Sequence, residues 1–184
     1  MIKLFQELKY TFIVSSLFLF ILLLPQSLYA QEKKAAEEKK TTQSTWQFGC
    51  GKTKNQKEIC QIQRDIRQNE GKDLIARVYF VRETDKKTAV TRFVLPLDVS
   101  LPYGVRYSVT KGGKRSEPVQ VAYQHCSKDG CVAAGNFTDE LAKSMREGAT
   151  FHVGFASKTL KGIEINIDLK GFTAIHDKFV KGGE

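Results

Sequence analysis

Four cysteines are the residues of this sequence with the most definite chemistry. Their spacings are Cys50-x9-Cys60 and Cys126-x4-Cys131. Four cysteines permit three pairings, and spacing alone does not decide among them. Pairing of near neighbours is the simplest, because it closes two short hairpin loops. The second of these loops contains Asp129-Gly130, which is a strong signal for a hairpin turn.

A zinc site and a redox site are the alternatives for these cysteines. Zinc-binding pairs usually follow C-x2–4-C, a spacing that only Cys126 and Cys131 approach. Redox pairs usually follow C-x-x-C, which is absent. His125 precedes Cys126, but neighbours on a strand point to opposite faces. We therefore expect two structural disulfides, each adding about 2–3 kcal/mol to the free energy of unfolding, and neither a metal nor another cofactor.

Other motifs give no support for catalysis. The segment 49–53 looks like the end of a phosphate-binding loop, but the position of the motif's first glycine holds Trp46 and no helix is expected to follow. Neither G-x-S-x-G nor H-E-x-x-H occurs. The three histidines, His125, His152 and His176, are far apart in the sequence. The sequence therefore predicts no catalytic residue and a protein that is not an enzyme.

Basic side chains recur in the expected loops. A domain rich in such loops is attracted to anionic surfaces such as lipid phosphates or acidic glycans. The alternative is that these lysines only keep sheet edges soluble. The loops lack interleaved aromatic residues, so nucleic acid is not an expected partner. The candidate contact residues are Lys52, Lys54 and Lys57 in one loop and Lys111, Lys114 and Arg115 in another, and Lys158 and Lys161 form a third group.

The N-terminus has the features of an export signal. Lys3 and Lys9 precede an apolar run of 13 residues at 12–24, Pro25 breaks the helix, and Ala30 is a small residue suited to cleavage. Spanning a bilayer takes about 20 residues, so the run is short for a membrane anchor. We expect residues 1–30 to be a signal peptide, with an uncleaved anchor as the alternative. Export favours disulfides over reduced thiols.

The rest of the chain divides into a linker and one domain. Residues 31–45 are rich in Glu and Lys and offer no apolar face, which predicts a flexible, solvated linker. The domain is expected to span 46–180, followed by a disordered tail at 181–184. Of the 29 basic and 20 acidic side chains, Lys3, Lys9 and Glu7 precede the linker, which leaves a net charge of +8 for the exported part.

Within the domain, short runs with period two predict β-strands. In the clearest run, at 163–170, Ile163, Ile165 and Ile167 share one face and polar residues the other. That alternation is typical of an antiparallel sheet with one buried face. The expected strands are 46–50, 59–66, 74–81, 91–95, 105–109, 119–125, 131–134, 150–156 and 163–170.

One helix interrupts the strands. Thr138 is a suitable N-cap, Leu141 and Met145 form an apolar stripe, and Gly148 ends the helix. A shorter terminal turn is expected at 174–180. Many short strands and one short helix predict a mainly β protein, a β-sandwich with Greek-key-type connections. A closed barrel is the alternative.

The order of these features resembles the invasion-associated locus B family of exported bacterial proteins. A signal peptide and a polar linker precede the domain, and the resemblance covers residues 46–179. The motifs that carry it are Trp46-x3-Cys50, Cys60, Pro96, Pro102-x-Gly104-Val105, Val121-x-Tyr123-x-x-Cys126-x4-Cys131 and Ile167-x-Leu169-x-Gly171-Phe172.

The resemblance implies an immunoglobulin-like β-sandwich with two disulfides, in the periplasm or associated with the outer membrane. It implies no catalytic activity and a contribution to the invasion of host cells, notably red blood cells. The expected partner is a host-cell surface or another envelope protein. The alternative is a periplasmic module for envelope maintenance or stress that binds another envelope protein.

Overall fold

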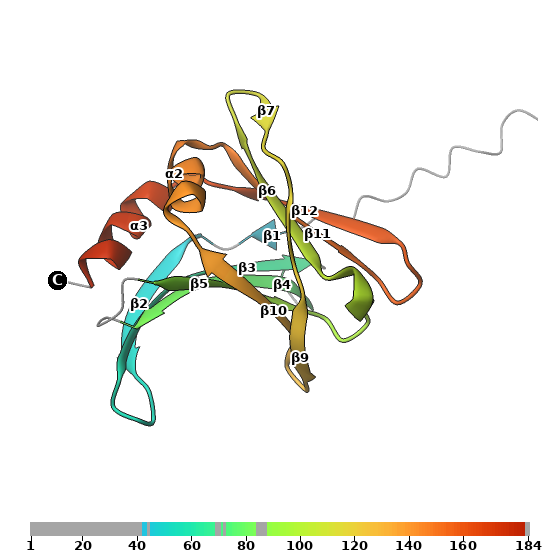
Figure 1. Cartoon of the computed structure of the whole chain (residues 1–184), viewed down its shortest axis with the longest axis horizontal. Coiled ribbons are helices and arrows are strands. Elements are labelled where there is room, and N and C mark those ends of the chain that lie inside the picture. The colour runs from blue at the N-terminus through green and yellow to red at the C-terminus, as the bar shows by residue number, and fades with distance from the viewer. Residues whose placement is uncertain (1–41, 44, 69–70, 72, 84–87, 183–184) are drawn as a thin grey trace, which may run out of the picture. The chain divides into compact units, whose positions relative to one another are not determined.

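The computed structural model describes residues 42–43, 45–68, 71, 73–83 and 88–182. All of these residues belong to the unit that spans 39–184. The predicted signal peptide and most of the predicted linker therefore lie outside the described residues. The described part forms two antiparallel sheets with two α-helices at one end (Figure 1).

The larger sheet contains seven strands in the order β1-β3-β4-β5-β10-β9, and β2 also pairs with β3. All of these pairs are antiparallel. Its strands are β1 (Thr42–Gln43), β2 (Gln47–Lys52), β3 (Glu58–Gln68), β4 (Asp73–Glu83), β5 (Ala89–Leu95), β9 (Tyr123–Ser127) and β10 (Gly130–Phe137).

The smaller sheet contains five strands in the order β12-β11-β6-β7, and β8 also pairs with β6. Its strands are β6 (Val105–Lys111), β7 (Lys114–Arg115), β8 (Val119–Val121), β11 (Thr150–Ala156) and β12 (Gly162–Asp168). The helices are the short 3-10 helix η2 (Leu101–Tyr103), α2 (Asp139–Glu147) and α3 (Phe172–Lys181).

Two α-helices are present where the sequence predicted one short helix and a terminal turn. The predicted helix is α2, and the Leu141 backbone N–H donates to the Thr138 hydroxyl at its start. The second helix, α3, forms because Phe172, His176 and Phe179 bury one helical face. It extends to Lys181, the first residue of the expected tail, and Gly182 caps it in a left-handed conformation.

The predicted strand at 119–125 is divided between the two sheets. Residues Val119–Val121 pair with β6 of the smaller sheet, whereas Tyr123–Ser127 pair with β10 of the larger sheet. The chain therefore crosses from one sheet to the other at Ala122. The alternating sequence pattern continues through this crossing, which is why it does not mark the change of partner.

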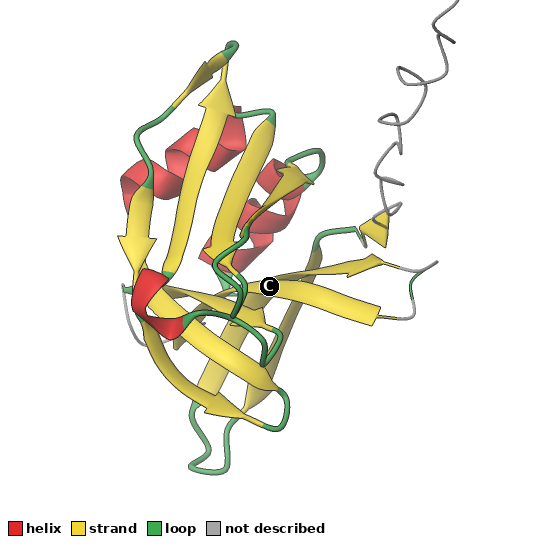
Figure 2. Ribbon diagram, turned by 90° about the vertical axis from the view of Figure 1, so that its right-hand side faces the viewer, coloured by secondary structure: helices red, strands yellow, loops and turns green. Residues whose placement is uncertain are grey.

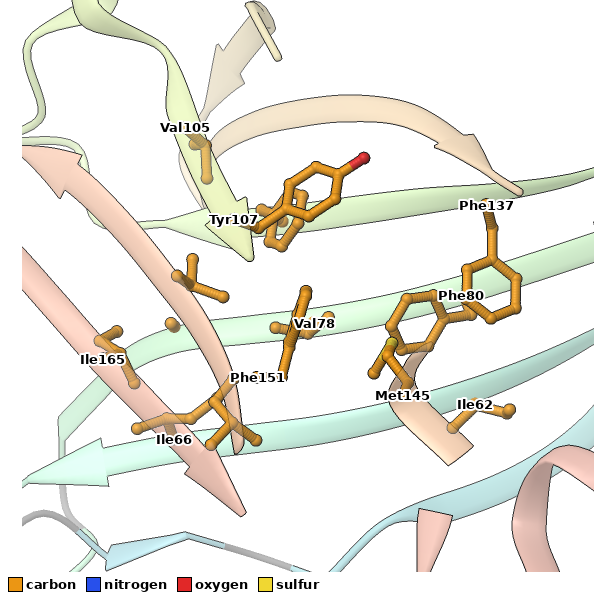
Figure 3. Packing of buried hydrophobic residues seen from close by; sticks show 14 of the residues in the cluster. Ile62, Ile66, Val78, Phe80, Val105, Tyr107, Phe137, Met145, Phe151 and Ile165 are labelled. Atoms are coloured by element: carbon orange, nitrogen blue, oxygen red, sulfur yellow. The ribbon is translucent and has the colours of Figure 1, made fainter. Parts of the chain in front are cut away.

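The core lies between the two sheets, as Figure 3 shows. Phe80 of the larger sheet is fully buried, and its ring contacts those of Phe137 and Phe151 as well as Trp46 and Phe172 near the α3 end. Two facing sheets with a shared apolar layer form a β-sandwich, which confirms the coarser fold prediction.

The immunoglobulin-like part of the fold prediction is not confirmed. Immunoglobulin domains combine strands ABED in one sheet and CFG in the other. Here the four successive strands β2, β3, β4 and β5 all lie in the larger sheet.

A buried arginine also joins the two sheets. Arg64 points inward from β3, is only 7% exposed, and lies beneath the Trp46 ring, 5.2 Å from its centroid. Its Nη1 donates to the backbone oxygen of Asp168 at the end of β12, which also accepts a hydrogen bond from the Trp46 indole. Burial lowers the pKa of the Arg64 guanidinium. These contacts fix β3 against β12 near the start of the domain.

Candidate functional site

The four cysteines form two disulfides with the near-neighbour pairing, Cys50–Cys60 and Cys126–Cys131. In each pair the two residues are directly opposite each other on neighbouring antiparallel strands. The first disulfide joins β2 to β3 and the second joins β9 to β10. Because β2 and β9 lie at opposite edges of the larger sheet, the two disulfides cross-link the hairpin at each edge.

Each disulfide has one buried and one exposed cysteine. Cys60 and Cys131 are almost fully buried and belong to the core, whereas Cys50 and Cys126 are exposed. The Gly182 carbonyl oxygen, at the end of α3, lies 3.7 Å from both sulfur atoms of the first disulfide. Arg82 holds the same helix end, with Nη2 donating to the Phe179 carbonyl at 2.6 Å. The first disulfide therefore also supports the position of α3.

The candidate basic loops do not come together. The β2–β3 loop with Lys52, Lys54 and Lys57 and the β6–β7 hairpin with Lys111, Lys114 and Arg115 lie at opposite ends of the domain (Figure 1). Three of these cations have acidic partners. Lys57 pairs with Glu83, Lys111 with Glu147 and Arg115 with Glu164. The structure thus provides no single basic patch from these six residues.

A different surface is hollowed, on the outer face of the larger sheet. Rows of side chains cross the strands there, and the strand register places Tyr79 opposite Arg92, and Val132 between Val94 and His125. The hollow measures about 340 Å³. Its lining residues are Gln61, Tyr79, Val81, Arg92, Val94, Gln124, His125 and Val132. We call this surface the sheet hollow.

The floor of the sheet hollow is apolar and its rim is polar. Val81, Val94 and Val132 are half-buried between strands. Arg92, Gln124 and His125 are exposed, and within the described part of the chain no hydrogen bond or ion pair engages their side chains. A surface with an apolar floor and a few polar groups that remain available is the usual form of a binding site.

An ion-pair network contacts the sheet hollow through Tyr79. Both Nε and Nη2 of Arg77 donate to the Asp65 carboxylate, and its Nη1 donates to the Tyr79 hydroxyl at 3.1 Å. The hydrogen bonds from Arg77 hold the pKa of the Asp65 carboxyl below its ordinary value. The network therefore fixes the Tyr79 hydroxyl and pairs the charge of Arg77 with a carboxylate.

The outer face of the smaller sheet carries a second polar cluster, which is hydrogen-bonded within itself. His152 on β11 lies between Thr110 on β6 and Asn166 on β12, with distances of 2.7 Å from Nε2 to the threonine hydroxyl and 2.7 Å from Nδ1 to the amide oxygen. Beside it, Arg115 donates to both Ser108 and Glu164. These groups satisfy one another across four strands, β6, β7, β11 and β12, as expected of a structural network.

Two further observations limit the kinds of site in the described residues. No group of three or more His, Cys, Asp or Glu side chains has the proximity needed to hold a metal ion there. In the same residues, no helix has the length and apolar character required to cross a membrane.

Sequence reasoning identified the disulfides but missed the sheet hollow. The available signal lies in the predicted strands at 74–81 and 91–95, where the outward positions hold Tyr79, Val81 and Val94 rather than only charged residues. An outward face with this composition is unusual for a fully solvated sheet surface. The contribution of Gln124 and His125 depends on the bulge between Val132 and Ala133 and on the β9–β10 pairing, which the pattern does not reveal.

The fold and the disulfides define a small β-sandwich whose larger sheet is cross-linked at both edges. The chain belongs to the Invasion associated locus B (IalB) protein family, whose model matches residues 46–180. This confirms the resemblance found in the sequence. No curated protein matches the chain.

A solved structure shares the fold. The crystal structure of invasion associated protein B from Bartonella henselae superimposes with a TM-score of 0.61. The two chains are 16% identical, and the match covers 76% of this chain and 95% of that one. At this level of identity the likeness establishes a common fold.

Proposed function

We propose that this protein is exported, after removal of residues 1–30, and contributes to the invasion of host cells as a non-enzymatic binding protein. The observation that carries the proposal is the sheet hollow, with Arg92, Gln124 and His125 available at its rim. Membership of the IalB family and two disulfides support export, since disulfides persist in oxidising compartments. The expected location is the periplasm or the outer membrane.

The chemistry of the sheet hollow favours a protein partner with an acidic or hydroxyl-bearing segment. Arg92 can donate several hydrogen bonds to a carboxylate, and Gln124 and His125 add donors and acceptors close by. Val81, Val94 and Val132 offer apolar contact beneath them. The disulfides at both edges keep the strands that carry these residues in register, so the surface is ordered before a partner binds.

The experiment is an invasion assay with the producing bacterium, after deletion of the gene. We expect fewer host cells to be invaded, with rescue by the wild-type gene and by a Lys143→Glu variant. Lys143 is an exposed residue of α2, away from the sheet hollow. An Arg92→Glu variant, which reverses a charge at the hollow, should be exported normally but should not rescue invasion.

Three outcomes would count against this proposal. Normal invasion by the deletion strain would overturn the role in invasion. Loss of envelope integrity without any loss of invasion would favour the alternative, a periplasmic module that binds another envelope protein. Rescue by Arg92→Glu as complete as rescue by Lys143→Glu would show that the sheet hollow is not needed for invasion.

A further inference from the structure

Exposed apolar side chains gather at the end of the domain opposite α2 and α3. Seven large hydrophobic residues are exposed in the described part of the chain, and five of them belong to two adjacent segments. One segment is the loop that precedes β6 and contains η2, and the other is the β11–β12 turn with the start of β12. The five are Leu97 (60% exposed), Leu101 (51%), Tyr103 (50%), Leu160 (60%) and Ile163 (37%).

Backbone hydrogen bonds hold these two segments side by side. The Lys158 N–H donates to the Asp98 carbonyl at 2.6 Å, and the Ser100 N–H donates to the Ala156 carbonyl at 2.8 Å. Figures 1 and 2 show η2 beside the β11–β12 hairpin in both views. Tyr103 and Leu160 also line a common groove of about 430 Å³. We call the surface formed by the five apolar residues the apolar tip.

Leu160 occupies a backbone conformation that disfavours leucine. Its φ is +61°, in the left-handed region, within a turn closed by hydrogen bonds from Leu160 N to Ser157 O and from Ser157 N to Lys161 O. Glycine or asparagine would fit this position with less strain, and a polar residue would suit its exposure. Neither folding nor solubility therefore explains the leucine, which makes a functional contact the better explanation.

Basic side chains flank the apolar tip. Lys158 and Lys161 lie in the same turn as Leu160 and are exposed, and Arg106 lines the adjoining groove. Asp98 is an opposing charge in the neighbouring loop, and Glu164, which also lines the groove, is paired with Arg115 at 2.7 Å. Exposed leucines on loops, bordered by lysines, match the boundary between the acyl chains and the anionic headgroups of a lipid bilayer.

We propose that the apolar tip inserts into the surface of a bilayer that contains anionic phospholipid. Leu97, Leu101 and Leu160 enter the acyl boundary, while Lys158 and Lys161 contact headgroup phosphates. The inference is independent of the sheet hollow, because it involves other residues and a lipid rather than a protein. It places lipid contact on a different loop from the two basic groups that the sequence offered as candidates.

The experiment is flotation of the exported protein, recovered from the producing cells, with protein-free vesicles. The vesicles contain either phosphatidylcholine alone or phosphatidylcholine with about one-third phosphatidylglycerol. The variant is Leu160→Asn, which relieves the backbone strain and so cannot lose binding by unfolding. Val180→Asn is the matched control, because Val180 is an equally exposed aliphatic residue (55%) on α3, far from the apolar tip. All proteins carry the same N-terminus, checked by mass.

We expect wild-type protein to float with the anionic vesicles. Leu160→Asn should weaken this binding about tenfold, because loss of one inserted leucine lowers the affinity for the bilayer by about that factor. Val180→Asn should bind like the wild type. A Lys158→Glu/Lys161→Glu double variant should lose the preference for anionic over neutral vesicles.

The proposal is overturned if wild-type protein does not float with the anionic vesicles, or if Leu160→Asn floats as well as the wild type. Equal losses in Leu160→Asn and Val180→Asn would also overturn it, because binding would then reflect general hydrophobicity. Since no protein partner is present, none of these results bears on the sheet hollow.

Discussion

The sheet hollow and the apolar tip expose apolar groups in different ways. In the sheet hollow, half-buried valines lie on strands whose edges are cross-linked, and the polar groups stand at the rim. In the apolar tip, leucines that are more than half exposed project from loops, one of them in a strained conformation. The first surface is shaped in advance, whereas the second consists of separate protruding side chains.

This difference indicates two kinds of partner. A surface shaped in advance binds a molecule of complementary shape with little loss of conformational entropy. Protruding leucines bordered by lysines gain little from a shaped partner but can each insert separately into a lipid layer. If both proposals hold, the domain combines a protein-binding face with a membrane-binding end, and variants should separate the two activities.

Removal of the disulfides should have the largest effect on stability, and of the two surfaces it should affect only the sheet hollow. Replacing both cysteines of Cys50–Cys60 by alanine should lower the free energy of unfolding by about 3 kcal/mol, and the same change at Cys126–Cys131 by about 2 kcal/mol, since the second closes a shorter loop. Urea denaturation measures both.

For partner binding the order should be reversed, with loss of Cys126–Cys131 having a larger effect than loss of Cys50–Cys60. The β9–β10 hairpin itself carries Gln124 and His125, so loss of Cys126–Cys131 should weaken binding at the sheet hollow more. Vesicle binding by the folded protein should not change in either variant. A loss of vesicle binding in both variants would show that the two surfaces are not independent.

A pH series should test the part of the core that packs against α3, away from both surfaces. Burial lowers the pKa of His176 below its ordinary value of 6.5, and the nearby Arg146 adds to this. At pH values between the folded and the unfolded pKa of His176, the unfolded chain binds a proton at this side chain and the folded protein does not. The free energy of unfolding is therefore highest above about pH 6.5 and decreases as the pH drops below that value. His176→Phe keeps a ring among Phe137, Phe172 and Phe179 and should remove this decline.

Denaturation at about pH 7.5 and at about pH 5.5 measures the effect. An equal decline in wild type and His176→Phe would assign the pH dependence to other groups.

The polar network on the smaller sheet should prove structural, with a smaller effect. Thr110→Val removes the hydroxyl that bonds to His152 Nε2 and should lower the free energy of unfolding by about 1 kcal/mol. Neither partner binding nor vesicle binding should change. Loss of invasion at unchanged stability would instead make this network a third functional surface.

Much of the architecture could be predicted from the sequence, because its signals are local. Period-two runs indicated most strands, the cap at Thr138 indicated α2, and the near-neighbour pairing of the cysteines is the one observed. The terminal helix α3 was underestimated because Arg82, which holds its last carbonyls, lies on a distant strand. The sequence did not show that the fold places the two candidate basic loops at opposite ends of the domain.

The two proposed binding surfaces could not be predicted for a related reason. The sheet hollow depends on the register that brings Arg92, Val132 and His125 into neighbouring rows from three strands. The apolar tip depends on contact between two loops that are far apart in the sequence, and on the left-handed conformation of Leu160. Both surfaces depend on which strands and loops become neighbours in the fold, and the pattern of a single sequence does not show this.

The most direct test is binding of the exported protein to erythrocyte ghosts, before and after protease treatment of the ghosts. We expect wild-type binding to fall at least tenfold after protease treatment. Binding of Arg92→Glu to untreated ghosts should be reduced equally, whereas Lys143→Glu should bind normally. Residual binding should depend on Leu160. Binding of Arg92→Glu that equals the wild type, or wild-type binding that survives protease treatment unchanged, would contradict a protein-binding role for the sheet hollow.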